Sequence, residues 1–262
     1  MVSASLLTLP FDIIDHIFSF LKSHPKALLA CSRAHPLLSQ IAERYRFRHI
    51  VICTGFQINS NITYSFRLSD LLRYLAETPR IANYVAVLQV ELNPYQDFEG
   101  IASLLLMFPA LECIMLPTPR KDSAISWKAL PQNFRTAVEN CLCLPTLREV
   151  HVGNTSFPLS TLDNHANINY LSLAGPPEIE PLDLKTTHPQ IKSLAFEGFE
   201  HQESEFFCTW ARQHILKLQK LKYDFSCHEI ILEVFNICSN IEDLYLCLHR
   251  EGTPRELSSR LA

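Results

Sequence analysis

The amino-acid sequence predicts an α/β protein in which a small N-terminal unit of three helices, residues 1–45, precedes a solenoid with a curved parallel sheet, residues 46–262. Three observations predict this class. A helical, proline-interrupted apolar pattern fills the first 45 residues, a short apolar motif recurs from residue 85 onward, and segments with helical spacing lie between its copies. Hydrophobic residues make up 47% of the chain and charged residues 19%, which is enough apolar surface to bury a core.

The first helix is expected in residues 9–21, "LPFDIIDHIFSFL". Pro10 suits the first helical position, and Asp12 in the first turn complements the helix dipole. Apolar residues form two neighbouring stripes: Ile13, Ile17 and Phe20 make one, and Ile14, Phe18 and Leu21 make the other. One stripe requires a neighbour within the chain. The second either binds a partner outside the chain or packs on the rest of it.

Two more short helices are expected at residues 26–32 and 37–44, after breaks at residues 23–25 and 35–36 that contain His-Pro pairs. Three helices in about 35 residues cannot bury this much apolar surface among themselves.

Residues 9–42, "LPFDIIDHIFSFLKSHPKALLACSRAHPLLSQIA", resemble an F-box. The matching positions are Leu9, Pro10, Asp12, Ile13, Ile14, Ile17, Phe20, Leu21, Leu28, Leu29, Cys31 and Arg33. The sequence departs from the family where a Trp often follows the Arg, because His35 stands there. The resemblance implies docking on the Skp-type adaptor of a cullin–RING ubiquitin ligase. The residues expected at that interface are Leu9, Pro10, Ile13, Ile14, Ile17, Phe20, Leu21, Leu28 and Leu29.

A motif of the form apolar-x-x-apolar-x-apolar recurs seven times after residue 80, and each copy is expected to form a strand. The central apolar residues are Leu88, Ile114, Val150, Leu171, Leu194, Leu221 and Leu244. All but one of their separations fall within the period of about 20–29 residues that is typical of leucine-rich repeats. The exception, from Ile114 to Val150, indicates an insertion near Trp127.

Helices are expected between the strands at residues 69–77, 98–108, 134–143, 204–218 and 229–238, with shorter links around Thr161 and Leu184. Gly153, Gly175 and Gly198 are expected to form turns after three successive strands. The alternative is an open, doubly wound α/β sheet. The recurring motif and the lack of a glycine-rich phosphate loop favour the solenoid.

The whole chain is similar to F-box proteins with irregular leucine-rich repeats, a type abundant in mushroom-forming fungi. The basic, strand-like "RYRFRHIVI", residues 44–52, directly after the F-box strengthens this resemblance. In that family the repeats bind the target protein. The last motif lies close to the chain end and leaves a short tail for the polar cap that a solenoid needs, so a C-terminal truncation is left open.

Motif searches favour a non-catalytic protein without a cofactor. The sequence contains no G-x-S-x-G, H-E-x-x-H, G-x-x-x-x-G-K or G-x-G-x-x-G motif. Its net charge of −4 and the absence of a long basic run argue against nucleic acid and anionic membranes as partners. No apolar run approaches the roughly 20 residues of a membrane span.

The nine cysteines and eleven histidines show no spacing typical of a zinc site. Cys141 and Cys143 form a C-x-C pair, while Cys227 and Cys247 each lie near one histidine. We therefore expect packing roles for the cysteines and no metal. Because no signal peptide is recognisable, we expect reduced thiols and a cytoplasmic or nuclear protein.

The residues between the apolar positions of each strand are expected to face outward and bind a protein target. The predicted target-binding residues are Glu149, His151, Tyr170, Lys220, Lys222 and Tyr245. Tyr170 and Tyr245 are the expected anchors, since aromatic residues are enriched at binding hot spots. The alternative for each residue is a solvated strand position.

Two functions remain open from the sequence. The chain is either the substrate receptor of an SCF-type ligase, or a repeat-based interaction scaffold whose degenerate F-box no longer binds the ligase.

Overall fold

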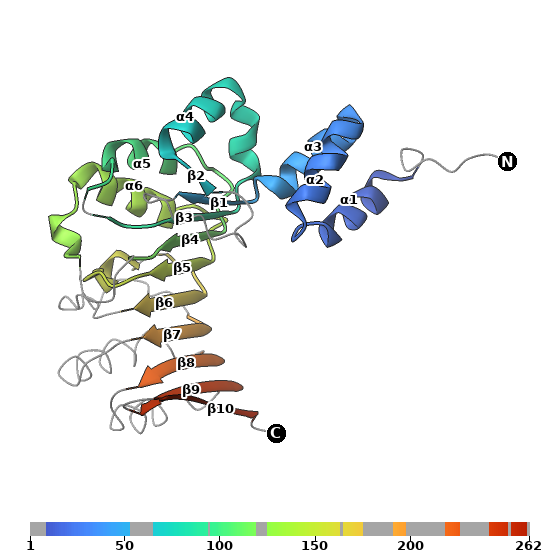
Figure 1. Ribbon diagram of the computed structural model, residues 1–262. Helices are drawn as coiled ribbons and strands as arrows, with labels where there is room; N and C mark the ends of the chain where they lie inside the picture. Colours follow the sequence, from blue (N-terminus) through green and yellow to red (C-terminus); the bar gives the residue numbers. More distant parts are fainter. Residues whose placement is uncertain are drawn as a thin grey trace.

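The computed structural model describes residues 9–52, 65–93, 95–118, 125–162, 165–174, 191–197, 218–225, 241–250 and 253–260. These residues form an α/β fold, which confirms the predicted class. Helices α1 (Phe11–Phe20), α2 (Pro25–Ala34) and α3 (Pro36–Arg46) form a group at one end of a long sheet (Figure 1). Pro10 lies one position earlier than expected, because it is the N-cap residue of α1 and its carbonyl accepts from the amides of Ile13 and Ile14.

The sheet contains ten strands in the order β10-β9-β8-β7-β6-β5-β4-β3-β1-β2 (Figure 1). Their bounds are β1 His49–Ile52, β2 Ser65–Phe66, β3 Val87–Val90, β4 Cys113–Leu116, β5 Glu149–Val152, β6 Tyr170–Ala174, β7 Ser193–Glu197, β8 Lys220–Phe225, β9 Asp243–Arg250 and β10 Thr253–Arg260. All neighbouring strands pair in parallel except β9 and β10. The seven expected strands are β3 to β9, and they lie side by side in sequence order.

The helices that follow the first strands are α4 (Leu68–Glu77), α5 (Phe98–Leu105) and α6 (Gln132–Leu142), with 3-10 turns η2 (Pro79–Tyr84), η3 (Trp127–Ala129) and η4 (Leu159–Leu162). These confirm three expected helices and the short link around Thr161. The helices expected at 204–218 and 229–238 lie outside the described residues except for Leu218, as do the link around Leu184 and the turns at Gly175 and Gly198.

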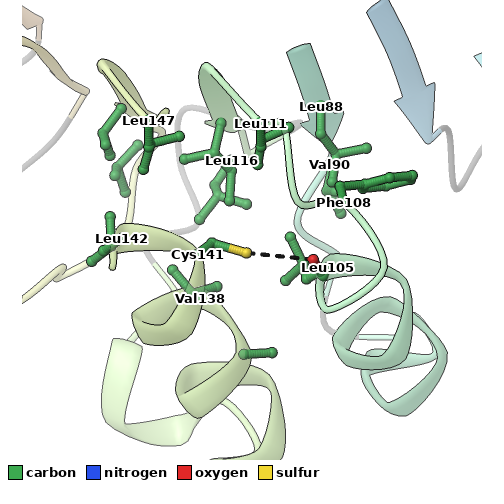
Figure 2. Packing of buried hydrophobic residues seen from close by; sticks show 14 of the residues in the cluster. Leu88, Val90, Leu105, Phe108, Leu111, Leu116, Val138, Cys141, Leu142 and Leu147 are labelled. Carbon is green, nitrogen blue, oxygen red and sulfur yellow. Dashed lines mark hydrogen bonds between the residues drawn. The ribbon is translucent and has the colours of Figure 1, made fainter. Parts of the chain in front are cut away.

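The main core fills the space between one face of the sheet and the helices. Figure 2 shows Leu88 and Val90 of β3 near Phe108 and Leu105, with Val138, Cys141 and Leu142 of α6 beside them. The Cys141 thiol donates a hydrogen bond to the Leu105 carbonyl at 3.6 Å, which ties α6 to α5. Trp127, in the expected insertion, is buried and packs edge-on against Phe157 at 4.8 Å between ring centroids. The insertion therefore adds an aromatic side chain to the core.

The helical group has its own small core and a defined junction with the sheet. Its buried residues are Ile14, Phe18, Leu28, Leu38, Ile41 and Ala42. At the junction, Phe47 is buried and stacks on Tyr74 of α4 and Phe66 of β2, at 5.4 and 6.2 Å between ring centroids. The Arg80 guanidinium donates to the Glu43 carboxylate at 2.9 Å, which joins η2 to α3.

Gly153 follows β5, as expected for a turn, but the structure gives a different reason for the glycine. Its φ lies outside the left-handed region, so the turn conformation does not require it. A Cβ at this position would instead overlap the backbone nitrogen of Thr118 and lie 2.9 Å from Pro117 Cα. The requirement is the close approach of two chain segments at the end of β4 and β5.

We expect Gly153→Ala to lower the free energy of unfolding by about 1–3 kcal/mol, because a backbone must shift to admit the methyl group. Chemical denaturation measures this change. Gly100→Ala is the comparison, since its Cβ would meet side chains, those of Asp97 and Leu68, rather than backbone. Alanine favours the α5 helix, which offsets part of the cost of shifting the Asp97 carboxylate that caps this helix through the Gly100 amide. If Gly153→Ala lowered the free energy of unfolding no more than Gly100→Ala does, the close-approach explanation would be contradicted.

Candidate functional site

Helix α1 presents an apolar stripe to solvent. Its inner stripe packs inside the helical group, where Ile14 and Phe18 are buried. The opposite stripe consists of Ile13, Ile17 and Phe20, which we call the outer face of α1. Ile13 is 47% exposed and Phe20 is 68% exposed, while Ile17 between them is half-buried. The second stripe is therefore not covered by the described residues of the chain.

Several neighbouring groups hold α1 in this orientation. The Tyr45 hydroxyl donates to the Asp15 carbonyl at 2.9 Å, and Arg44 lies 3.7 Å from the Asp15 carboxylate. Burial and the nearby Asp15 raise the pKa of Tyr45, so its hydroxyl remains a donor at neutral pH. These contacts come from α3 and fix the inner side of α1, which leaves its outer face directed away from the group.

The nine residues expected at an adaptor interface separate into three sets. Leu9, Pro10, Ile13 and Phe20 are exposed, and Ile17, Leu21 and Leu29 are half-buried. Ile14 and Leu28, which were also predicted at the interface, are fully buried, and both side chains fill the core of the helical group.

Two exposed apolar residues of the helical group were missed by sequence reasoning. Phe11, at the start of α1, is exposed beside the guanidinium of Arg44, which lies 6.0 Å from its ring centroid. Leu37, in the first turn of α3, is also exposed. The position of Leu37 directly after Pro36 was a usable signal, because few residues of the same helix can cover a side chain in its first turn.

The sheet carries a second candidate surface on the face opposite the core. Strand register brings outward side chains into two rows. The first row is Val87, Cys113, Glu149, Tyr170, Ser193, Lys220 and Asp243, and the second is Gln89, Met115, His151, Ser172, Ala195, Lys222 and Tyr245. All six residues predicted to bind a target lie in these rows.

The two lysines predicted to bind a target, Lys220 and Lys222, have different surroundings in the structure. The Lys220 ammonium lies 2.8 Å from the Asp243 carboxylate on the adjacent strand. This hydrogen bond and charge raise the pKa of Lys220. Lys222 is exposed and in register with Tyr245, which is also exposed. The surface here combines a neutralised pair with one lysine and one aromatic side chain.

On strands β4 and β5, Glu149 and His151 lie near Cys113, a residue that the sequence analysis did not select. His151 Nε2 lies 3.8 Å from a Glu149 carboxylate oxygen, and the His151 ring lies 4.8 Å from the Tyr170 ring centroid. Cys113 is in register with Glu149 and is buried. One potential ligand atom from each of Cys113, Glu149 and His151 lies within 4.8 Å of the others.

The electrostatics of this group follow from burial. Burial lowers the pKa of His151 although Glu149 acts in the opposite direction, so the imidazole is neutral at pH 7. Burial, together with the neighbouring Glu149, raises the pKa of the Cys113 thiol to about 12. The group therefore contains a neutral imidazole and a protonated thiol beside a carboxylate. The His151 side chain is 27% exposed and its Nε2 atom is buried.

No protein-family model matches the chain, and no curated protein resembles it in sequence. In the part of the chain that the structure describes, every helix is too short or too polar to cross a bilayer.

We expect the chain without a partner to bind an environment-sensitive apolar dye at the outer face of α1. The double variant Ile13→Glu/Phe20→Glu should lose most of the dye fluorescence, because it places charge on an exposed apolar stripe without touching the inner core. Fluorescence titration measures this, and thermal unfolding checks that the fold persists. Leu106→Glu, at an exposed leucine after α5, is the control. Equal dye binding by wild type and the double variant would contradict this assignment.

Proposed function

We propose that this protein is the substrate-recognition subunit of an SCF-type cullin–RING E3 ubiquitin ligase. In this proposal the helical group is an F-box that docks on the Skp-type adaptor, and the strands from β3 onward belong to an irregular leucine-rich-repeat domain that binds a protein target. The observation that carries the proposal is the exposed outer face of α1 on a small helical group at one end of the sheet.

The outer face has the chemistry of a helix-in-groove interface. Ile13, Ile17 and Phe20 are spaced i, i+4 and i+7, so they lie on one side of the helix and can enter one apolar groove. Burying a large apolar side chain contributes about 1.5–3 kcal/mol. A partner that covers this face would therefore gain several such contributions.

The arrangement of the sheet supports the repeat assignment. Strands β3 to β9 follow each other in sequence order, with parallel pairing between neighbours. A doubly wound sheet reverses its strand order at a switch point. A solenoid adds one strand per repeat in order, and this arrangement favours the solenoid over the doubly wound alternative.

The two outward rows are the proposed target surface. They mix aromatic, polar and paired charged groups, and they contain no continuous basic track, which favours a protein over a nucleic acid. The ubiquitin-ligase assignment and the reduced cysteines that we propose place the protein in the cytoplasm or the nucleus.

We expect Ile13→Glu/Phe20→Glu to weaken binding to the Skp-type adaptor at least about 30-fold, since losing a desolvated apolar anchor costs about 2 kcal/mol or more. Calorimetry or surface plasmon resonance with the purified adaptor measures the dissociation constant. These two positions are better probes than Ile17, whose half-buried side chain also contributes to packing.

Leu106→Glu is the matched control for adaptor binding, because it also introduces a charge at an exposed apolar residue but lies after α5. Its dissociation constant should equal that of wild type. A wild-type chain that shows no adaptor binding would instead support a scaffold with a degenerate F-box.

We expect the triple variant Tyr170→Ala/Lys222→Ala/Tyr245→Ala to lose target capture while adaptor binding stays unchanged, because the three side chains lie on strands far from α1. Quantitative comparison of proteins cross-linked to wild type and variant measures the loss. Tyr95→Ala, at a tyrosine that is 95% exposed between β3 and α5, is the control. Unchanged capture by a folded triple variant would move the target site away from the two rows.

A further inference from the structure

Three side chains of different ligand types meet at the early part of the two rows. Cys113 opens β4, Glu149 opens β5, and the two residues are paired across the strands. His151 lies two residues further along β5, so it shares a face with Glu149. Their potential ligand atoms lie within 4.8 Å of one another, and among the residues that the structure describes no other group of three comes this close.

One polar atom in this group makes no hydrogen bond. His151 Nε2 is buried, and the Glu149 carboxylate oxygen that lies 3.8 Å from it is at ion-pair distance, longer than a hydrogen bond. A buried polar atom without a hydrogen bond destabilises the folded protein. A ligand bound between the three side chains would remove this destabilisation.

We infer that Cys113, Glu149 and His151 form a zinc-binding site on the open face of the sheet. Thiolate, imidazole and carboxylate are the three side-chain types that zinc takes as ligands. In a tetrahedral site with bonds of about 2.0–2.3 Å, ligand atoms lie about 3.3–3.6 Å apart. The 3.8 Å between His151 and Glu149 is close to this value, and the half-exposed Glu149 side chain can adjust.

The charges of the three side chains and the chemical softness of the sulfur and nitrogen ligands both suit Zn²⁺. A Cys113 thiolate and the Glu149 carboxylate together neutralise a divalent cation, while the neutral His151 adds a nitrogen ligand. Sulfur and nitrogen ligands select zinc over magnesium and calcium, which prefer oxygen. Binding replaces the thiol proton by the metal, so one proton leaves Cys113 for solvent and no electron is transferred.

The site would provide three protein ligands, so one position of a tetrahedral zinc ion would remain for water or an external ligand. Half of the Glu149 side chain is exposed, so solvent reaches this part of the group. Three protein ligands with an open fourth position are typical of zinc sites that accept an external ligand. This inference stands on the three side chains and does not rest on the proposed function.

The test titrates the reduced, metal-free full chain with Co²⁺ and then with Zn²⁺ against a chelator of known affinity. We expect a thiolate-to-cobalt charge-transfer band that decreases in Cys113→Ala. We also expect Zn²⁺ affinity to fall more than about 100-fold in Glu149→Gln and His151→Gln, because loss of outer-shell partners alone costs 10–100-fold. Zn²⁺ should raise the melting temperature of wild type but not of these variants.

Glu99→Gln and Cys143→Ala are the matched controls, because Glu99 is an exposed carboxylate in the first turn of α5, and Cys143 is an exposed cysteine after α6. Both should keep wild-type zinc affinity. Glu149→Gln replaces an exposed carboxylate by its isostere, so it tests the site even if Cys113→Ala fails to fold. Wild-type zinc affinity and stoichiometry in folded Glu149→Gln and His151→Gln would overturn the inference.

Discussion

The fold depends on one row of buried apolar side chains that runs across the parallel strands. The central residues of the seven motifs, from Leu88 through Val150 to Leu244, are paired in register on neighbouring strands and are all buried. Because side chains alternate along a strand, this row determines which residues face the other way. A slip of one residue would bury Glu149 and Lys220 and expose the row. The register that builds the core therefore also builds both outward rows.

The strands β3 to β9 were predictable because each motif is local and repeats the same burial pattern. Two other strands were not: β2 contains two residues, and β10, "TPRELSSR", is polar and includes Pro254, which an edge strand tolerates. The two stripes of α1 were also predictable, but the choice of inner stripe was not, since Ile13 and Ile14 are the same residue type. That choice follows from the packing of Ile14 and Phe18 against residues of α2 and α3, with the Tyr45 hydroxyl of α3 donating to the Asp15 carbonyl.

The group of Cys113, Glu149 and His151 illustrates why a search by local spacing does not find side chains that strand pairing brings together. Metal motifs are recognised from ligands a few residues apart, whereas Cys113 and Glu149 lie in different copies of the strand motif. The usable signal was their shared place in the motif, directly before the central residues Ile114 and Val150. Parallel pairing in register brings equivalent motif positions together, so candidate sites in such a chain are found by aligning its repeats.

The relation between the outer face of α1 and the sheet is determined mainly by Phe47. The ion pairs Arg80–Glu43 and Arg48–Glu112 have partly or largely exposed side chains, and such pairs contribute about 0–1 kcal/mol. Phe47 is 3% exposed, directly follows α3, and stacks on Tyr74 and Phe66. Burial of a phenylalanine contributes about 1.5–3 kcal/mol. Apolar packing at this residue therefore contributes more to the junction between the helical group and the sheet than either ion pair does. Under the proposed function, such a junction would hold the adaptor bound at α1 in a defined position relative to a target bound on the sheet.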